Sequence, residues 1–190
     1  MIRRVNSVIS RFVARKALKV CGKNFRLGYS SHIKGYRNIS IGNNFFSGPY
    51  LYLNINNISE ICIGHDVMLG PYVKIISGNH ILHYRYGPMN SAPPKVRGDD
   101  KGIVINNDVW IGAGVTILDG AHISEGAVIG AGSVVSKYIP PYVIAAGNSV
   151  RVIKPRFSFS DLSVLLEAKR STLTVEEIKE QYIKYGVVNG

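Results

Sequence analysis

The most constraining feature of this sequence is a six-residue repeat in its second half. Every sixth position from residue 105 onward carries a β-branched aliphatic side chain: Ile105, Ile111, Ile117, Ile123, Ile129 and Val135. The same register occurs earlier at Ile63, Leu69 and Ile75, and small residues and glycines fill many of the places between. A period of six matches neither a helix of 3.6 residues per turn nor the two-residue alternation of an ordinary strand. It predicts an all-β solenoid in which three hexads close one triangular coil and coils stack about 4.8 Å apart.

A longer repeat locates a break in this solenoid. Similar seven-residue segments begin at Ile39, Ile61 and Ile103, with offsets of 22 and 42 residues. Once one 18-residue coil is subtracted, insertions of 4 and 24 residues remain, and the second equals the length of segment 81–104. That segment is rich in proline, and it predicts a protruding loop that leaves after His80 and rejoins at Ile105. A β-sandwich of short strands is the alternative, but it would not hold one register for so long.

Charge is distributed very unevenly along the 190 residues. The 23 Lys and Arg against 12 Asp and Glu give a net charge of +11, yet residues 1–59 contain ten basic and no acidic side chains. The remainder is nearly neutral, and the basic segment has no interleaved aromatic pattern for base stacking, so we expect no nucleic-acid partner. Cys21 and Cys62 form no disulfide framework. No apolar run has the length of a membrane span or of a secretory signal, and we expect a cytoplasmic protein.

Both ends of the chain predict helices. Residues 2–20 form a basic amphipathic pattern, with an expected apolar face of Ile2, Val5, Val8, Ile9, Phe12, Val13 and Ala17. This helix either caps the first coil or contacts an anionic membrane surface. At the other end, Thr174 to Glu177 is a capping box, followed by apolar residues at helical spacing: Val175, Ile178, Tyr182 and Tyr185. A shorter helix around Leu162, Leu165 and Leu166 precedes it. We therefore divide the chain into a lead-in (1–26), a β-helix domain (27–156) and a helical cap (157–190).

The candidates for chemistry reduce to histidines, because no phosphate-binding loop, GxSxG or HExxH motif is present. His80 ends a coil where the long loop departs, and an imidazole suits proton transfer near neutral pH. His122 stands one coil above His80 in the hexad count, and His83 lies three residues further along the chain. A metal site built from these three is an alternative, although we expect no metal.

Several motifs carry a resemblance to a known family. Residues 107–117 (NDVWIGAGVTI), 126–137 (GAVIGAGSVVSK), 139–142 (IPPY) and 146–154 (AGNSVRVIK) resemble the signature of the hexapeptide-repeat acyltransferases. The nearest branch is that of the galactoside, maltose and nodulation-factor acetyltransferases, with xenobiotic and polysaccharide O-acetyltransferases as relatives. The resemblance implies a left-handed parallel β-helix, a homotrimer with active sites between subunits, and acetyl-CoA as co-substrate.

The resemblance also assigns roles to residues. His80 matches the family's general base, which takes a proton from the acceptor as it attacks the thioester. The positions that match the acetyl-CoA site are Trp110, Ala113, Ala131, Ser136, Lys137, Arg151 and Lys154. Apart from the resemblance, the candidate acceptor contacts are Tyr50, Asn54 and the loop residues His83, Tyr84 and Arg85, whose aromatic and basic groups suit either stacking on a sugar or trimer contacts. Asn148-Ser149-Val150 replaces the usual Asn-Pro-Ala, and the acceptor strand lacks the Asp of the galactoside enzymes.

These observations favour an acetyl-CoA-dependent O-acetyltransferase that acts on a saccharide, such as a polysaccharide precursor. A xenobiotic or antibiotic O-acetyltransferase, a sugar N-acetyltransferase and a catalytically silent β-helix that serves as a binding module remain alternatives. A metal enzyme like the γ-class carbonic anhydrases fits poorly, because the expected His-x4-His pair is absent.

Overall fold

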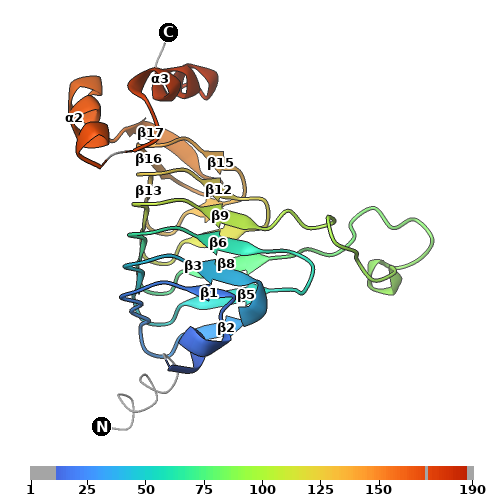
Figure 1. Cartoon of the computed structure of the whole chain (residues 1–190). Helices are drawn as coiled ribbons and strands as arrows, with labels where there is room; N and C mark the ends of the chain where they lie inside the picture. Colours follow the sequence, from blue (N-terminus) through green and yellow to red (C-terminus); the bar gives the residue numbers. More distant parts are fainter. Residues whose placement is uncertain (1–11, 170, 188–190) are drawn as a thin grey trace.

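The computed structural model describes residues 12–169 and 171–187, which wind into a prism with three sheets as its walls (Figure 1). Sheet A contains β1 (Val20–Cys21), β3 (Ile39–Ile41), β6 (Ile61–Ile63), β9 (Ile103–Ile105), β12 (His122–Ile123) and β15 (Tyr138–Ile139). Sheet B contains β4 (Phe46–Ser47), β7 (Met68–Leu69), β10 (Trp110–Ile111), β13 (Val128–Ile129), β16 (Val143–Ala146) and β17 (Arg151–Pro155). Sheet C contains β2 (His32–Lys34), β5 (Tyr52–Ile55), β8 (Lys74–Ser77), β11 (Thr116–Leu118) and β14 (Val134–Val135).

The chain runs from sheet A to B to C in each coil, as a left-handed parallel β-helix. Neighbouring coils are joined by parallel pairing, so Val104 lies between Cys62 and His122 in sheet A. The six aliphatic residues of the predicted hexad register are each at most 1% exposed. Each such burial contributes about 1.5–3 kcal/mol, and together these side chains fill the inside of the prism. The hexad prediction of the fold is confirmed.

Left-handed backbone conformations turn the chain between the walls. Between sheets A and B the turn residue is Asn44, Asp66, Asp108, Gly126 or Tyr142, depending on the coil. Between sheets B and C, Tyr50 and Tyr72 have φ of 62° and 60°, where later coils use Gly114 and Gly132. Asn and Asp tolerate this conformation better than other L-residues. Glycine therefore occupies only some of the turns between the walls, and Asn, Asp and Tyr occupy the others.

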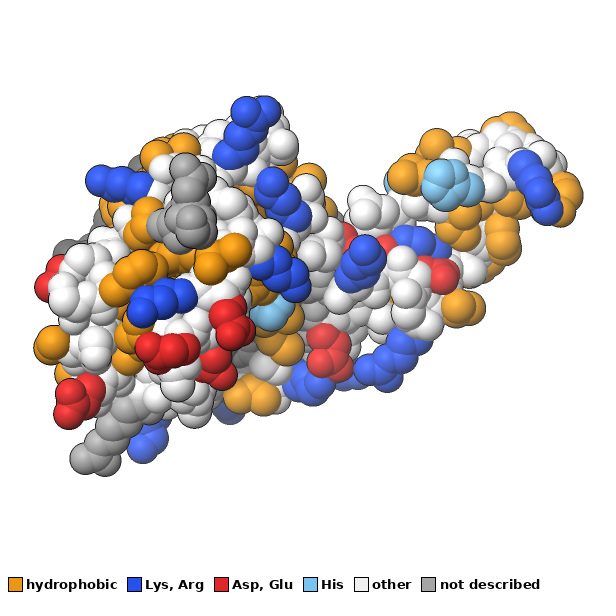
Figure 2. Space-filling view, turned by 90° about the horizontal axis from the view of Figure 1, so that it is seen from above, with side chains coloured by type: hydrophobic (Ala, Val, Ile, Leu, Met, Phe, Trp, Pro, Cys, Tyr) orange, Lys and Arg blue, Asp and Glu red, His pale blue; other side chains and the backbone are white. Residues whose placement is uncertain are grey.

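A long loop projects from the prism between β8 and β9, as predicted (Figures 1 and 2). It spans residues 78–102 and includes the short 3-10 helix η2 (Met89–Ser91), so it begins and ends a few residues earlier than expected. The earlier departure follows from Gly78, whose φ of +106° turns the chain out of the wall. Figure 2 shows hydrophobic, histidine and basic side chains gathered on the projecting end.

The N-terminal helix differs from its prediction. Residues 2–11 of it lie outside the described residues, and residues 12–17 are helical. The amide of Lys19 then donates to the carbonyls of Tyr36 and Ile39, at 3.1 and 3.0 Å, and the chain enters β1 beside η1 (Tyr36–Asn38). The expected apolar face was wrong for two side chains: Phe12 and Val13 are 60% and 49% exposed. Ala14 and Leu18, one position further round the helix, are buried instead.

The C-terminal helices agree with the sequence prediction. β17 folds back antiparallel on β16 and leads into α2 (Phe159–Lys169) and α3 (Val175–Lys184). Thr174 caps α3 in a complete capping box with Glu177. The buried side chains of these helices are Leu162, Leu166, Ile178 and Tyr182, and they join the core of the last coil. The three-part division of the chain remains a prediction. Across residues 12–169 and 171–187, no helix has both the length and the apolar character needed to cross a membrane.

Candidate active site

The edge of the prism between sheets C and A, where the long loop leaves, is termed the loop corner. β8 ends at Ser77, and Gly78, Asn79 and His80 follow as the first residues outside the wall. A Cβ on Gly78 would lie 2.5 Å from Nδ2 of Asn56, so the backbone can pass here only without a side chain. His80 is exposed just beyond this point.

Hydrogen bonds accepted by the carboxylate of Asp119 hold both ends of the loop at this corner. The Ser77 hydroxyl donates to Oδ1 of Asp119 at 2.7 Å. The amides of Lys101 and Gly102, where the loop returns, donate to the same carboxylate at 2.9 Å each. Ser59 and Ser77 share a further hydroxyl contact of 2.9 Å. The segment that carries His80 therefore leaves the wall from a point that these hydrogen bonds fix.

A polar hollow of about 370 Å³ lies where the loop leaves the wall. Its lining residues are Lys34, Asn54, Ile55, Asn56, Asn57, Ser77 and Gly78. The structure thus brings Asn54, a predicted acceptor contact, beside the segment that leads to His80. Amide side chains and one ammonium group suit hydrogen bonding to a ligand with several hydroxyls.

The residues predicted to hold acetyl-CoA fall into two groups. Ser136 and Lys137 follow β14 and lie exposed at the loop corner, above the coil that Asp119 belongs to. The other group lies on sheet B and its edge with sheet C: Trp110, Ala113, Ala131, Arg151 and Lys154, all exposed. The turns at Ala113 and Ala131 approach each other closely, since a Cβ on Gly112 would lie 2.6 Å from the amide nitrogen of Ala131. In one chain, these two groups occupy different edges of the prism.

The remaining predicted acceptor residues are not brought to the loop corner. Tyr50 lies in the turn between sheets B and C, where its ring stacks on Tyr72 at a centroid distance of 4.7 Å. His83, Tyr84 and Arg85 lie on the projecting loop, with the Arg85 guanidinium 5.3 Å from the ring centre of Tyr86.

His122 lies in a separate hollow from the one beside Gly78. Its ring meets that of Tyr138 edge to face, 5.2 Å apart, and burial lowers the pKa of the imidazole. This hollow, of about 370 Å³, is formed by sheet A and the C-terminal segment, including Glu125, Leu173 and Gln181. The described residues hold no group of three or more His, Cys, Asp or Glu that could bind a metal ion.

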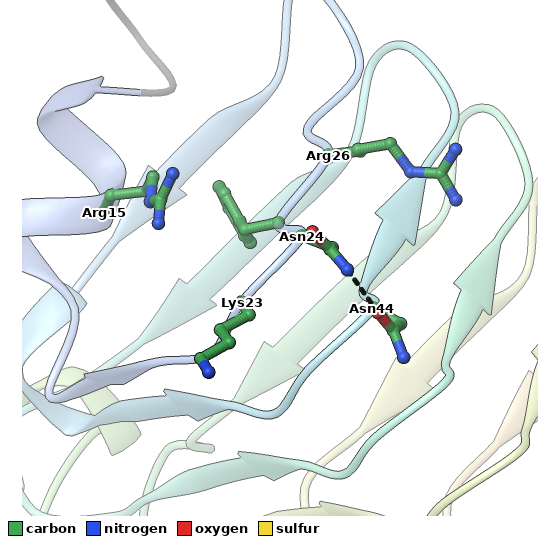
Figure 3. A pocket seen from close by; sticks show the side chains of 6 residues that line it. Arg15, Lys23, Asn24, Arg26 and Asn44 are labelled. Carbon is green, nitrogen blue, oxygen red and sulfur yellow. Dashed lines mark hydrogen bonds between the residues drawn. The ribbon is translucent and has the colours of Figure 1, made fainter.

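A larger hollow, of about 720 Å³, lies at the first coils. It is lined by Arg15, Lys23, Asn24, Phe25, Arg26 and Asn44. Nδ2 of Asn24 donates to Oδ1 of Asn44 at 2.8 Å, and Figure 3 shows the three cationic groups spread around the hollow. Asn44 in turn donates to Asp66, the nearest carboxylate in this bond network.

Sequence reasoning missed three residues that shape the loop corner. Lys95, Asp100 and Asp119 were not singled out, yet each binds the segment around His80 or its return. A signal existed for Asp119: it stands 42 residues after Ser77, the offset that also relates Ile75 to Ile117. No repeat offset relates Lys95 or Asp100 to the coil below.

Comparison with known proteins identifies the family. Residues 102–137 match the family model described as bacterial transferase hexapeptide (six repeats). The chain is also 30% identical over 175 residues to the chloramphenicol acetyltransferase of Klebsiella aerogenes, covering 85% of this chain and 81% of that enzyme. The chain belongs to the hexapeptide-repeat acyltransferases.

Two further members of this family are informative. Galactoside O-acetyltransferase of Escherichia coli K12 is 40% identical over 120 residues, which is 62% of this chain. That match spans only about half of the Escherichia coli enzyme, 54% of its length. A hexapeptide-repeat acetyltransferase from Vibrio cholerae, solved with acetyl coenzyme A, superposes with a TM-score of 0.69 at 26% identity. This superposition covers 80% of this chain and 78% of that one.

Proposed function

We propose that this chain transfers an acetyl group from acetyl-CoA to a hydroxyl group of a saccharide, with His80 as the general base. Membership of a family whose solved member holds acetyl coenzyme A is the observation that carries the proposal. The position of His80 supports it, because the imidazole is exposed two residues after Gly78, which lines the polar hollow. The galactoside O-acetyltransferase relative supports a saccharide acceptor.

The proposed reaction needs one proton carrier and no covalent enzyme intermediate. The imidazole of His80 takes the proton from the acceptor hydroxyl while its oxygen attacks the thioester carbonyl. The carbon–sulfur bond then breaks, the CoA thiolate leaves, and the imidazolium returns the proton to it. Backbone amides at the turns stabilise the negative charge on the carbonyl oxygen. The products are the acetyl ester and free CoA.

We also propose a homotrimer, because one chain does not assemble the whole site. Trp110, Ala113 and Ala131 lie on a different edge of the prism from His80. The outer face of sheet B carries a column of exposed apolar residues in register, Phe46, Met68 and Trp110, at 39%, 50% and 51% exposure. Such a column favours cover by another subunit. Arg151 and Lys154 would then meet the phosphates of acetyl-CoA.

A xenobiotic acceptor is the second candidate. The match to the chloramphenicol acetyltransferase extends over 175 residues, whereas the match to the galactoside enzyme extends over 120. The longer match favours an acceptor of the chloramphenicol type.

The release of free CoA thiol tests these proposals together. Purified protein is incubated with acetyl-CoA and, in separate reactions, a thiogalactoside, maltose, an amino sugar and chloramphenicol. We expect thiol release with a saccharide and an acetyl ester as the product, even with the amino sugar, which carries hydroxyl groups beside its amine. Thiol release with chloramphenicol alone would establish the second candidate. If none of the four acceptors gave thiol release, a catalytically silent binding module would be favoured.

We further propose that the protein works in the cytoplasm at the inner face of the membrane, held there by residues 1–20 and the basic first coils. Arg15, Lys23 and Arg26 are spread around their hollow, which suits an extended anionic surface better than one bound anion (Figure 3). Phe12 and Val13 add exposed apolar side chains to the helix that carries Arg15.

Vesicle sedimentation tests the membrane contact. A triple variant, Arg15→Gln, Lys23→Gln and Arg26→Gln, is compared with the parent on vesicles of phosphatidylglycerol and of phosphatidylcholine. We expect the parent to bind the anionic vesicles alone and the triple variant to bind them at least tenfold less. Equal binding of both proteins would leave the first helix as a cap of the solenoid.

A further inference from the structure

Both backbone groups of Asn79, the residue before His80, are bound by side chains from the far end of the loop. The ammonium of Lys95 donates to the carbonyl oxygen of Asn79 at 2.7 Å. The amide of Asn79 donates to Oδ1 of Asp100 at 3.2 Å. These partners stand 16 and 21 residues further along the chain, so the contacts depend on the path of the whole loop.

Lys95 and Asp100 also form an ion pair that is shielded from water. The Asp100 side chain is fully buried and that of Lys95 is 17% exposed. Nδ2 of Asn56 donates to the second carboxylate oxygen of Asp100 at 2.6 Å. Burial alone would raise the pKa of the Asp100 carboxyl, but hydrogen bonds from Lys95, Asn56 and the Asn79 amide hold it below its ordinary value. The carboxylate is therefore charged at neutral pH, and its hydrogen bonds are of the strong, charge-assisted kind.

His80 itself has little else to hold it. Within the part of the chain that the structure describes, its imidazole is exposed and makes no hydrogen bond to another side chain. Gly78, on the other side of Asn79, is fixed by its close approach to Asn56. The place of His80 is thus set by the backbone of residues 78 and 79.

We propose that Lys95 and Asp100 are positioning residues, which bind both backbone groups of Asn79 and thereby fix His80 for proton transfer. This inference rests on the proposed role of His80 as the general base. A displacement of about 1 Å of a catalytic group is enough to slow a reaction substantially. Loss of the hydrogen bonds to Asn79 should therefore lower kcat more than it weakens substrate binding.

Kinetics of matched variants test the positioning role. The variants are Asp100→Asn and Lys95→Met, with Asp99→Asn as the control. Asp99 is exposed on the same loop, and among the described residues its carboxylate accepts a hydrogen bond only from the amide of Val96. With acetyl-CoA and the acceptor that gave thiol release, we expect kcat to fall at least tenfold in the first two variants. The KM for acetyl-CoA should stay within twofold, and the control should match the parent. Unchanged kcat in folded Asp100→Asn and Lys95→Met would overturn the proposal.

A double-mutant cycle separates this inference from the proposed function. If the hydrogen bonds to Asn79 act through His80, Asp100→Asn lowers kcat no further in a His80→Ala background. An equal loss in both backgrounds would show that Asp100 acts by another route. Full activity of His80→Ala alone would instead refute the general base itself.

Hydrogen exchange in the unaltered protein tests the hydrogen bond of the Asn79 amide without any substitution. We expect the amide of Asn79 to exchange at least 100-fold more slowly than the amides of Leu82 and His83, which lie in the exposed loop. Exchange at the same rate would show that the Asn79 contacts do not persist in solution, and this result would overturn the proposal even if Asp100→Asn failed to fold.

Discussion

The hydroxyl of Ser77 donates to Oδ1 of Asp119, one coil above it, at 2.7 Å. This bond joins the last residue of β8 to the carboxylate that also binds the amides of Lys101 and Gly102. The departure and the return of a 25-residue loop, 78–102, are thereby tied to one side chain of the next coil. A loop of this length would otherwise be free to move away from the wall, and the candidate base with it.

Removal of that carboxylate should loosen the return of the loop. In Asp119→Ala, the amides of Lys101 and Gly102 and the Ser77 hydroxyl lose their acceptor, and we expect a loss of about 2–3 kcal/mol in the free energy of unfolding. Chemical denaturation measures this loss. The exposed Asp99 provides the control, and Asp99→Ala should cost less than about 1 kcal/mol. Equal costs for the two variants would contradict the role of Asp119.

Gly78 should not accept a side chain. Alanine there combines a φ of +106° with a Cβ 2.5 Å from Asn56, and we expect a cost of about 2–3 kcal/mol together with displacement of His80. Gly98 is a matched control, since its φ is +102° but nothing lies within 4 Å of a Cβ. Gly98→Ala therefore reports the backbone strain alone. Thermal unfolding of both variants should show the larger loss for Gly78→Ala.

The stability of the fold should decline in mildly acidic solution because of His122. Burial lowers the pKa of this imidazole from its ordinary 6.5, so the unfolded chain binds a proton more readily than the folded chain. The stabilising contribution is complete above pH 6.5 and is lost as the pH falls below that value. We expect the melting temperature to drop between pH 7.5 and 5.5, and to drop less in His122→Gln. The exposed His83 serves as the control, and His83→Gln should keep the slope of the parent.

The hydroxyl of Tyr182 should stabilise the C-terminal helices. It donates to the carbonyl oxygen of Tyr142 at 2.8 Å, and burial raises the pKa of Tyr182 to about 12, so the donor stays protonated. Tyr182→Phe removes one of the two hydrogen bonds to this carbonyl, since the amide of Arg156 still donates to it at 2.8 Å, and we expect a cost of about 1 kcal/mol. Tyr185→Phe, at a tyrosine that is 42% exposed, should change stability by less than about 0.5 kcal/mol. Calorimetric unfolding of both proteins distinguishes the two sites.

The sequence alone was sufficient for the repeat and for the existence of the loop. The period of Ile105 and its successors arises because the same inward position is filled once in each successive wall, and the proline-rich break marks where pairing stops. The capping box at Thr174 was recognisable because both of its bonds lie within four residues. Local chemistry and strict periodicity leave a trace in a single sequence.

Contacts set by the path of the loop left no such trace. Lys95 meets Asn79 only because 25 loop residues return to the same corner, and no spacing rule predicts that return. The buried face of the first helix was also wrong, because packing against the first coil buries Ala14 and Leu18 and leaves Phe12 and Val13 exposed. The apolar pattern alone does not reveal which of these side chains faces the first coil.

The most direct test of the account is the turnover of His80→Asn beside the parent protein. Asparagine keeps a polar side chain at the exposed start of the loop but cannot take up a proton at neutral pH. We predict that kcat for acetyl transfer from acetyl-CoA falls at least 10²-fold, while the melting temperature and the KM for acetyl-CoA remain those of the parent. Near-normal turnover in the folded variant would contradict the assignment of His80 as the general base.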